Sequence, residues 1–199
     1  MARYFPRKPS LLFKGAAALG IAVLASLTWK QCQFWKNDWL LWERAVAVDP
    51  ANRIAHYNLG TLYIGTDPKT AIQEFLIVLN LDPNDADAHY NLASLYSQSG
   101  QHPLALLHYQ ETLRLRPKSL QTLNNMALVY FAMGKTRDAM NLLDRALAED
   151  GGFAEGRFNR GALLIMQGER KKGEMDIRQA IVERPDLRPR AQKLGISDK

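Results

Sequence analysis

The residues that could support metal or redox chemistry are few. The chain has one cysteine, Cys32, and four histidines: His56, His89, His102 and His108. One cysteine excludes an internal disulfide and a cysteine-cluster zinc site. His56 and His89 share one place in a repeated pattern, which favours packing, and His102 and His108 do not have metal-ligand spacing, so we expect them to be solvated. We therefore predict no metal site.

Motifs for catalysis are also missing from the sequence. It contains no glycine-rich phosphate loop, no nucleophile elbow and no pair of metal ligands at helical spacing. We therefore predict that the protein is not an enzyme and uses no cofactor.

Asparagine is the polar residue with the most regular spacing. It occupies the sixth place of each of four copies of a pattern, as Asn58, Asn91, Asn125 and Asn159. In a stacked array, equivalent residues form a column along the concave face. An amide both donates and accepts hydrogen bonds, so such a column can hold the backbone of an extended peptide. The alternative is that the asparagines only stabilise contacts between helices.

Neighbouring places in the copies should set the selectivity of such a groove. The groove changes from mixed polar to apolar toward the C-terminus, which predicts either a pocket for an apolar peptide or partner helix, or packing against the C-terminal segment. The candidate residues beside the asparagines are Tyr57, Tyr90, Asn124, Leu128, Phe131, Phe158 and Ile165.

Helix breakers recur at a fixed interval and delimit the elements that carry these residues. Pro50, Pro83, Pro117 and Pro185 are 33, 34 and 68 residues apart, and Gly151 lies halfway between the last two. Between breakers, apolar residues three or four apart predict two amphipathic helices per copy. Four copies fill residues 53–187, and we expect the turn glycines to adopt left-handed conformations at the end of each first helix: Gly65, Gly100, Gly134 and Gly168.

This pattern resembles the tetratricopeptide repeat from about Asp38 to Leu187, because small and large residues recur in the same order in all four copies. The resemblance implies an all-α helix-turn-helix solenoid, and some members of the family use an asparagine ladder on their ligands. The Lys and Arg pairs with which other members clamp a C-terminal carboxylate are missing here. Two departures stand out: the first copy is one residue short near Gly65, and the last has Arg160 and Gly173 where an apolar residue and alanine are usual.

Both ends of the array differ from the copies. Residues 31–52 form an aromatic junction and the second helix of an incomplete copy, and residues 188–199 form a C-terminal cap. A charge such as Arg160 at an inner place fits a terminal copy that faces solvent. The junction is similar to that of multi-span membrane proteins with tetratricopeptide tails, many of them glycosyltransferase-like, although this chain has one candidate span.

The net charge of the chain lies at its N-terminus. The chain has 26 basic and 20 acidic residues, a net charge of +6. The first 36 residues contain six basic residues and no acidic one, so the remainder sums to zero. A nucleic-acid partner needs a basic face on the folded domain, and we therefore predict none.

The N-terminal segment is predicted to anchor the chain in a membrane. After a basic arm at residues 1–10, residues 11–30 are mostly apolar and, as a helix, about long enough for a bilayer core of roughly 30 Å. Aromatic residues favour the membrane interface, and the chain's four tryptophans follow the apolar run: Trp29, Trp35, Trp39 and Trp42. A cleaved signal peptide and an organelle-targeting segment are the alternatives. The basic arm predicts a cytoplasmic N-terminus, with the repeats on the outer, periplasmic side of a bacterial inner membrane.

These features lead to three functional hypotheses. The first is a membrane-anchored scaffold that binds a protein or extended peptide in its groove and assembles or stabilises a membrane or periplasmic complex. The second is an accessory subunit of a membrane complex, held mainly by its transmembrane helix. The third is a detached module of a glycosyltransferase system.

Overall fold

The computed structural model describes Ser26, Trp29 and residues 38–196, and this part of the chain contains helices and no strand. The predicted all-α class is confirmed. The helices are α2 (Asp38–Val48), α3 (Arg53–Tyr63), α4 (Pro68–Leu81), α5 (Ala86–Gln98), α6 (His102–Leu115), α7 (Leu120–Ala132), α8 (Thr136–Glu149), α9 (Ala154–Met166), α10 (Arg170–Glu183), a 3₁₀ turn η1 (Pro185–Leu187) and α11 (Arg188–Lys193).

Side-chain caps fix where the first helices of three copies begin. The side chains of Asn52, Asp85 and Ser119 accept hydrogen bonds from backbone N–H groups three residues later, at 3.0, 2.9 and 3.4 Å. Such caps satisfy backbone donors that a helix leaves unpaired at its start. The same cap in three copies gives the first helices the same register, so equivalent side chains point to the same face.

Glycine ends three of the four first helices. Gly100, Gly134 and Gly168 have φ values of 74°, 75° and 88°, in the left-handed region that favours glycine. The expectation for Gly65 is wrong, because Gly65 does not have a positive φ. The turn after α3 is one residue shorter than the turns of the other copies. Ile64 at its start has a right-handed helical conformation, and Asp67 at its end caps α4.

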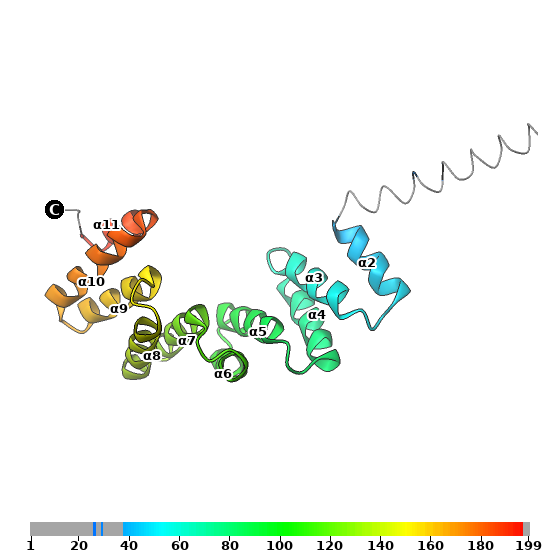
Figure 1. Cartoon of the computed structure of the whole chain (residues 1–199), viewed down its shortest axis with the longest axis horizontal. Helices are drawn as coiled ribbons and strands as arrows, with labels where there is room; N and C mark the ends of the chain where they lie inside the picture. Colours follow the sequence, from blue (N-terminus) through cyan, green and yellow to red (C-terminus); the bar gives the residue numbers. More distant parts are fainter. Residues whose placement is uncertain (1–25, 27–28, 30–37, 197–199) are drawn as a thin grey trace, which may run out of the picture.

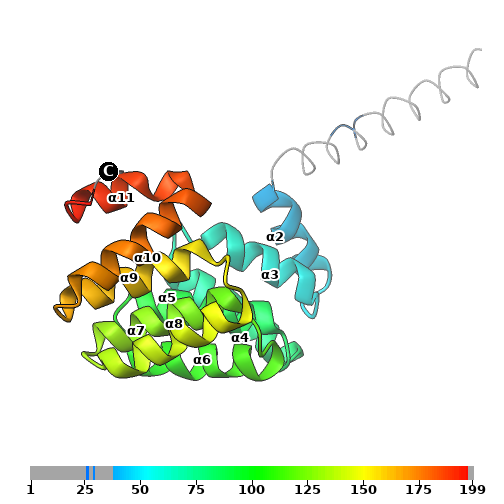
Figure 2. The same cartoon turned by 60° about the vertical axis from the view of Figure 1, so that its left-hand side comes forward.

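The helices pair in sequence order and follow an arc (Figures 1 and 2). In Figure 1, α3, α5 and α7 lie on the inner, concave side, and α4, α6 and α8 lie on the outer side. Each second helix contributes one large, almost fully buried side chain at the same place: Phe75, Tyr109, Leu143 and Ile177. Small residues on the facing helices, such as the buried Ala93 and Ala105, let the backbones approach closely.

The fourth pair uses different contacts. A Cβ on Gly161 would lie 2.7 Å from the carbonyl oxygen of Gly173, so glycine at both places lets α9 and α10 cross at very short range. On the first helix of this pair, Arg160 occupies the place that a buried apolar residue occupies in the other three copies. Its guanidinium donates to Asp176 at 2.7 and 2.9 Å and to Asp144 at 2.9 Å, so the charge is paired rather than simply solvated.

Two terminal elements complete the array. The incomplete copy is α2, whose Trp39 ring packs edge-on against Tyr63 with ring centroids 4.3 Å apart. At the other end, Ala191 of α11 and the following Ile196 are buried in one cluster with Phe158 and Leu187.

The predicted membrane anchor, residues 11–30, lies outside the described residues except for Ser26 and Trp29. Among the helices that the structure describes, none is long and apolar enough to cross a bilayer. The anchor therefore stays a prediction.

Candidate functional site

Three of the four predicted asparagines connect neighbouring copies. Each donates from its amide nitrogen to the residue that directly precedes the equivalent asparagine in the preceding copy. Asn91 donates to the hydroxyl of Tyr57 at 3.2 Å, Asn125 to the hydroxyl of Tyr90 at 2.9 Å, and Asn159 to the amide oxygen of Asn124 at 2.7 Å. Stabilisation of contacts between copies, the alternative reading of this column, is therefore part of what the asparagines do.

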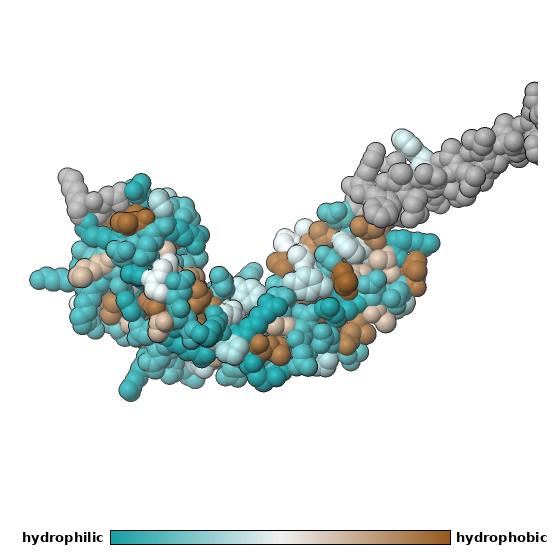
Figure 3. All heavy atoms as spheres, in the orientation of Figure 1, coloured by the Kyte–Doolittle hydropathy of each residue, from teal (hydrophilic) through white to brown (hydrophobic). Residues whose placement is uncertain are grey.

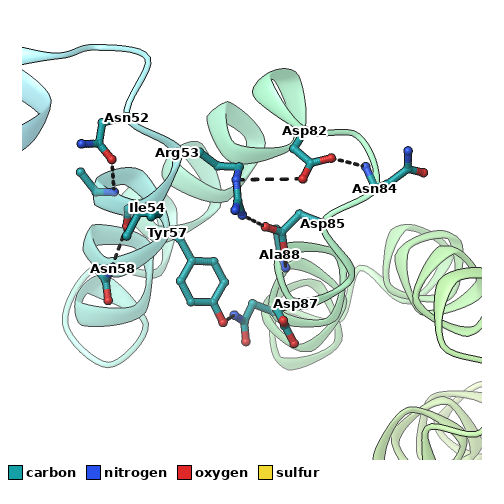
Figure 4. A network of polar contacts seen from close by, with 12 residues as sticks. Asn52, Arg53, Ile54, Tyr57, Asn58, Asp82, Asn84, Asp85, Asp87 and Ala88 are labelled. Carbon is teal, nitrogen blue, oxygen red and sulfur yellow. Dashed lines mark hydrogen bonds and ion pairs between the residues drawn. The ribbon is translucent and has the colours of Figure 1, made fainter.

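The first asparagine has no full copy before it and bonds within its own helix. Asn58 donates to the carbonyl oxygen of Ile54 at 2.7 Å (Figure 4). Beside it, Tyr57 extends from α3, and Arg53 pairs with Asp82 and Asp85 at the start of the next copy. The amide of Asn58 is half-buried, as are those of Asn91 and Asn125.

The C-terminal cap covers the fourth place of the column. Asn159 is only 5 % exposed, and its amide oxygen accepts a hydrogen bond from Arg190 of α11 at 3.1 Å. The Arg190 guanidinium also lies over the ring of Phe158, 4.5 Å from its centroid. Phe158 is 3 % exposed, and Ile165 packs against the same cluster. Phe158 and Asn159, like the buried Asn124, are closed to a partner, so the accessible face is shorter than expected.

The open part of the concave face lies over α5 and α7. Leu128 of α7 is 41 % exposed, whereas the half-buried Phe131 packs against the core between α7 and α8. A pocket of about 190 Å³ lies beside Leu128. Its lining residues are Ser94, Ser97, Gln98, Tyr109, Asn125 and Leu128. Figure 3 shows the concave outline of the molecule between its two ends.

The repeat pattern predicts Tyr109 only as a core residue and does not show that its hydroxyl belongs to this site. Its ring fills the core place of the second helix, but its hydroxyl reaches the hydroxyl of Ser94 at 3.2 Å and borders the pocket. Burial raises the pKa of Tyr109, so the hydroxyl stays protonated at neutral pH. The sequence indicates this hydroxyl only through the presence of a tyrosine where the other copies have Phe75, Leu143 and Ile177.

Comparison with known families decides what this array is. One tetratricopeptide-repeat family model matches residues 86–119, and a second matches residues 119–148. The chain is a tetratricopeptide-repeat protein. No curated protein sequence matches it well enough to count as a relative.

Solved structures with the same fold include other tetratricopeptide-repeat proteins. A crystal structure of MamA is 21 % identical, with a TM-score of 0.66, over 74 % of this chain and 87 % of that one. MamA from Desulfovibrio magneticus RS-1 is 15 % identical, with a TM-score of 0.69, over 83 % and 96 %. YrrB, described as a TPR protein with an unusual peptide-binding site, is 22 % identical, with a TM-score of 0.64, over 85 % and 88 %. At these identities, the likeness concerns the fold.

Acidic side chains at the starts of two first helices of this repeat protein are paired. Asp87 of α5 accepts two hydrogen bonds from Arg116, at 2.6 and 2.7 Å, and these lower the pKa of its carboxyl group. Glu155 of α9 accepts from Arg184 at 2.9 Å. These carboxylates are therefore poor candidates to attract a basic ligand.

The histidines of the repeat protein make contacts between helices. His56 bonds to Glu74 at 2.6 Å, and the Nδ1 atoms of His89 and His108 lie 3.0 Å apart. His108 is half-buried, so the expectation that it is solvated is wrong: α6 turns it toward α5 rather than outward. Over residues 38–196, no group of three or more potential ligands is placed to hold a metal ion.

The tryptophans that we expected at the membrane interface fall into different environments. Trp35 lies outside the described residues, and Trp29 is 67 % exposed. Trp39 and Trp42 are half-buried in α2, where Trp39 contacts Tyr63. Part of the apolar surface of Trp39 therefore serves the fold.

Proposed function

We propose that the protein is a non-enzymatic scaffold that binds an extended segment of a partner protein along the concave face of α3, α5 and α7. The observation that carries this proposal is the row of half-buried amides of Asn58, Asn91 and Asn125 on successive first helices. Each amide donates one N–H to another residue, and the carbonyl oxygen of Asn125 also accepts a hydrogen bond from Asn124 at 3.2 Å. The second N–H of each amide and the remaining carbonyl lone pairs can bind a ligand. Backbone groups of an extended peptide are matching acceptors and donors.

The fold comparison supports this use of the groove. YrrB is described as having a peptide-binding site and shares the fold with a TM-score of 0.64. The exposed Leu128 adds an apolar contact beside the amides, which suits a peptide that presents both backbone polar groups and apolar side chains. We infer assembly or stabilisation of a multi-protein complex as the role of such binding.

Replacement of the amides tests the groove. Asn91→Ala with Asn125→Ala should abolish capture of the native partner in a cross-linked pull-down. Because these asparagines also connect the copies, the matched control is Tyr57→Phe with Tyr90→Phe, which removes the same hydrogen bonds but keeps the amides. Equal loss of capture in both double variants would mean that only the fold was weakened, and unchanged capture in the asparagine variant would refute the proposal.

We further propose that residues 11–30 anchor the scaffold in a bacterial inner membrane, with the N-terminus in the cytoplasm and the repeats in the periplasm. The charge distribution supports this, because the basic residues that precede the apolar run are the ones that remain on the cytoplasmic side. The direct contact between α2 and α3 suits a solenoid that stands close to the membrane surface.

Deletion of residues 1–30 tests the anchor and separates the proposal from the accessory-subunit hypothesis. The truncated protein should leave the membrane fraction yet still bind its partner in solution. Loss of partner binding together with membrane attachment, in a truncated protein that remains folded by circular dichroism, would favour a subunit held by its transmembrane helix.

A further inference from the structure

The pocket between α5 and α7 has a lining with a distinct chemistry. Its lining residues carry no charge: Ser94, Ser97, Gln98, Tyr109, Asn125 and Leu128. Its volume of about 190 Å³ exceeds the roughly 10–15 Å³ that a single water needs. We propose that this pocket accepts one uncharged side chain bearing an amide or a hydroxyl from the peptide in the groove. This inference rests on the proposed function and specifies the class of ligand.

Two lining side chains provide hydrogen-bonding capacity. In the described part of the chain, Ser97 and Gln98 make no side-chain hydrogen bond to another residue. A hydroxyl and a primary amide together offer donors and acceptors. A guest amide or hydroxyl also needs both, so it replaces the waters of the pocket without leaving its own polar atoms unpaired.

The floor of the pocket is fixed by the buried core. The Tyr109 hydroxyl is held by Ser94 at 3.2 Å, and the Asn125 amide by Tyr90 at 2.9 Å. Both groups are positioned before a ligand arrives, which lowers the entropy lost on binding. Leu128 at the edge contacts the apolar part of the guest residue or its neighbour.

The absence of charge in this lining selects against charged guests. A carboxylate or ammonium that enters loses part of its hydration, and none of the lining residues supplies an opposite charge. The same lining disfavours a purely apolar guest, because the half-buried Ser97 would lose water without gaining a partner. Neutral polar side chains are the class that avoids both costs.

Peptide selection on the full-length protein tests this inference. A displayed library of random nonapeptides is selected on the purified chain in nanodiscs and counter-selected on the Asn91→Ala, Asn125→Ala variant, so that only groove binders remain. We expect one position of the selected peptides to be enriched in Asn, Gln, Ser or Thr. In a selected peptide, replacement of that residue by Glu or Lys should weaken binding at least about tenfold.

Pocket variants then assign that preference to the lining residues. Ser97→Ala with Gln98→Ala should weaken binding of the polar guest about threefold to tenfold and abolish its preference over Leu. The exposed Gln110→Ala on α6 is the matched control and should change nothing. Groove-binding peptides enriched in charged residues, or a preference that survives the pocket variant, would overturn this inference while the proposed function stood. Recovery of no groove-binding peptide would overturn both.

Discussion

At the residue scale, glycine serves different purposes at equivalent places. Gly100, with a φ of 74°, ends α5 in a conformation that an L-residue adopts only at a cost. Gly65 follows α3 at the equivalent turn and has no positive φ. A Cβ at this position would have no neighbouring atom within 4 Å. The same residue type is therefore required in one turn and only tolerated in the other.

Alanine at these two positions should have opposite effects. Gly65→Ala should raise the free energy of unfolding by roughly 0.4–1 kcal/mol, because it restricts the unfolded chain without strain in the folded one. Gly100→Ala should lower it by roughly 1–2 kcal/mol. Urea denaturation followed by circular dichroism measures both, and equal destabilisation would mean that the first turn also needs glycine.

The pair of His89 and His108 should make stability depend on pH. Burial, and then the nearby His89, lower the pKa of His108 from 6.5 to about 4, with Glu111 acting in the opposite direction. Between these two pH values the unfolded chain therefore binds more protons than the folded one. The contribution of neutral His108 to the free energy of unfolding is complete above pH 6.5 and is lost as the pH falls toward 4. His108→Gln should reduce the fall in Tm across that window. An unchanged slope would contradict the assignment.

At the scale of elements, α11 closes one end of the core. It contributes Ala191 to the cluster that contains Phe158 and Ile177, and its Arg190 binds Asn159. In a repeat protein each pair depends mainly on its neighbours, so loss of a terminal element weakens the adjacent pair first.

Truncation after Leu187 should therefore act locally. Amide hydrogens of α9 and α10 should exchange faster, whereas those of α5 and α6 should keep their protection. Hydrogen–deuterium exchange with mass spectrometry measures both segments in one experiment. Uniform loss of protection along the array would show that the repeats unfold as one cooperative unit.

The sequence predicts these elements well because local signals coincide. The caps, the turn glycines and the spaced prolines each restrict the backbone within a few residues, so helix positions and pairing can be predicted from the pattern. The accessibility of the site could not be predicted in the same way. Burial of Asn159 depends on α11 folding back over it, and the Tyr109 hydroxyl reaches the concave face only through its packing between α5 and α6.

At the scale of the whole molecule, the net charge is concentrated in a part of the sequence that precedes the repeats. The first 36 residues account for the net charge of +6, and the remaining residues sum to zero. The pocket in the groove has no charged lining residue, and the carboxylates of Asp87 and Glu155 are paired with arginines. Partner recognition should therefore rely on hydrogen bonds and apolar contacts.

Peptide affinity should accordingly depend little on salt. We expect the Kd of a groove-binding peptide to change less than about threefold between roughly 0.05 and 0.5 M NaCl, because screening affects interactions between charges. Isothermal titration calorimetry measures this directly. A Kd that rises more than about tenfold would indicate recognition by charge and contradict the account.

Site-specific photo-cross-linking in cells tests the central claim most directly. A photoreactive residue is placed at Leu128, 41 % exposed on the concave side, and in a matched variant at Leu107, 53 % exposed on the outer helix α6. We predict a cross-linked partner from position 128 and none from position 107. A partner captured only from position 107, or equally from both, would contradict binding through the concave groove.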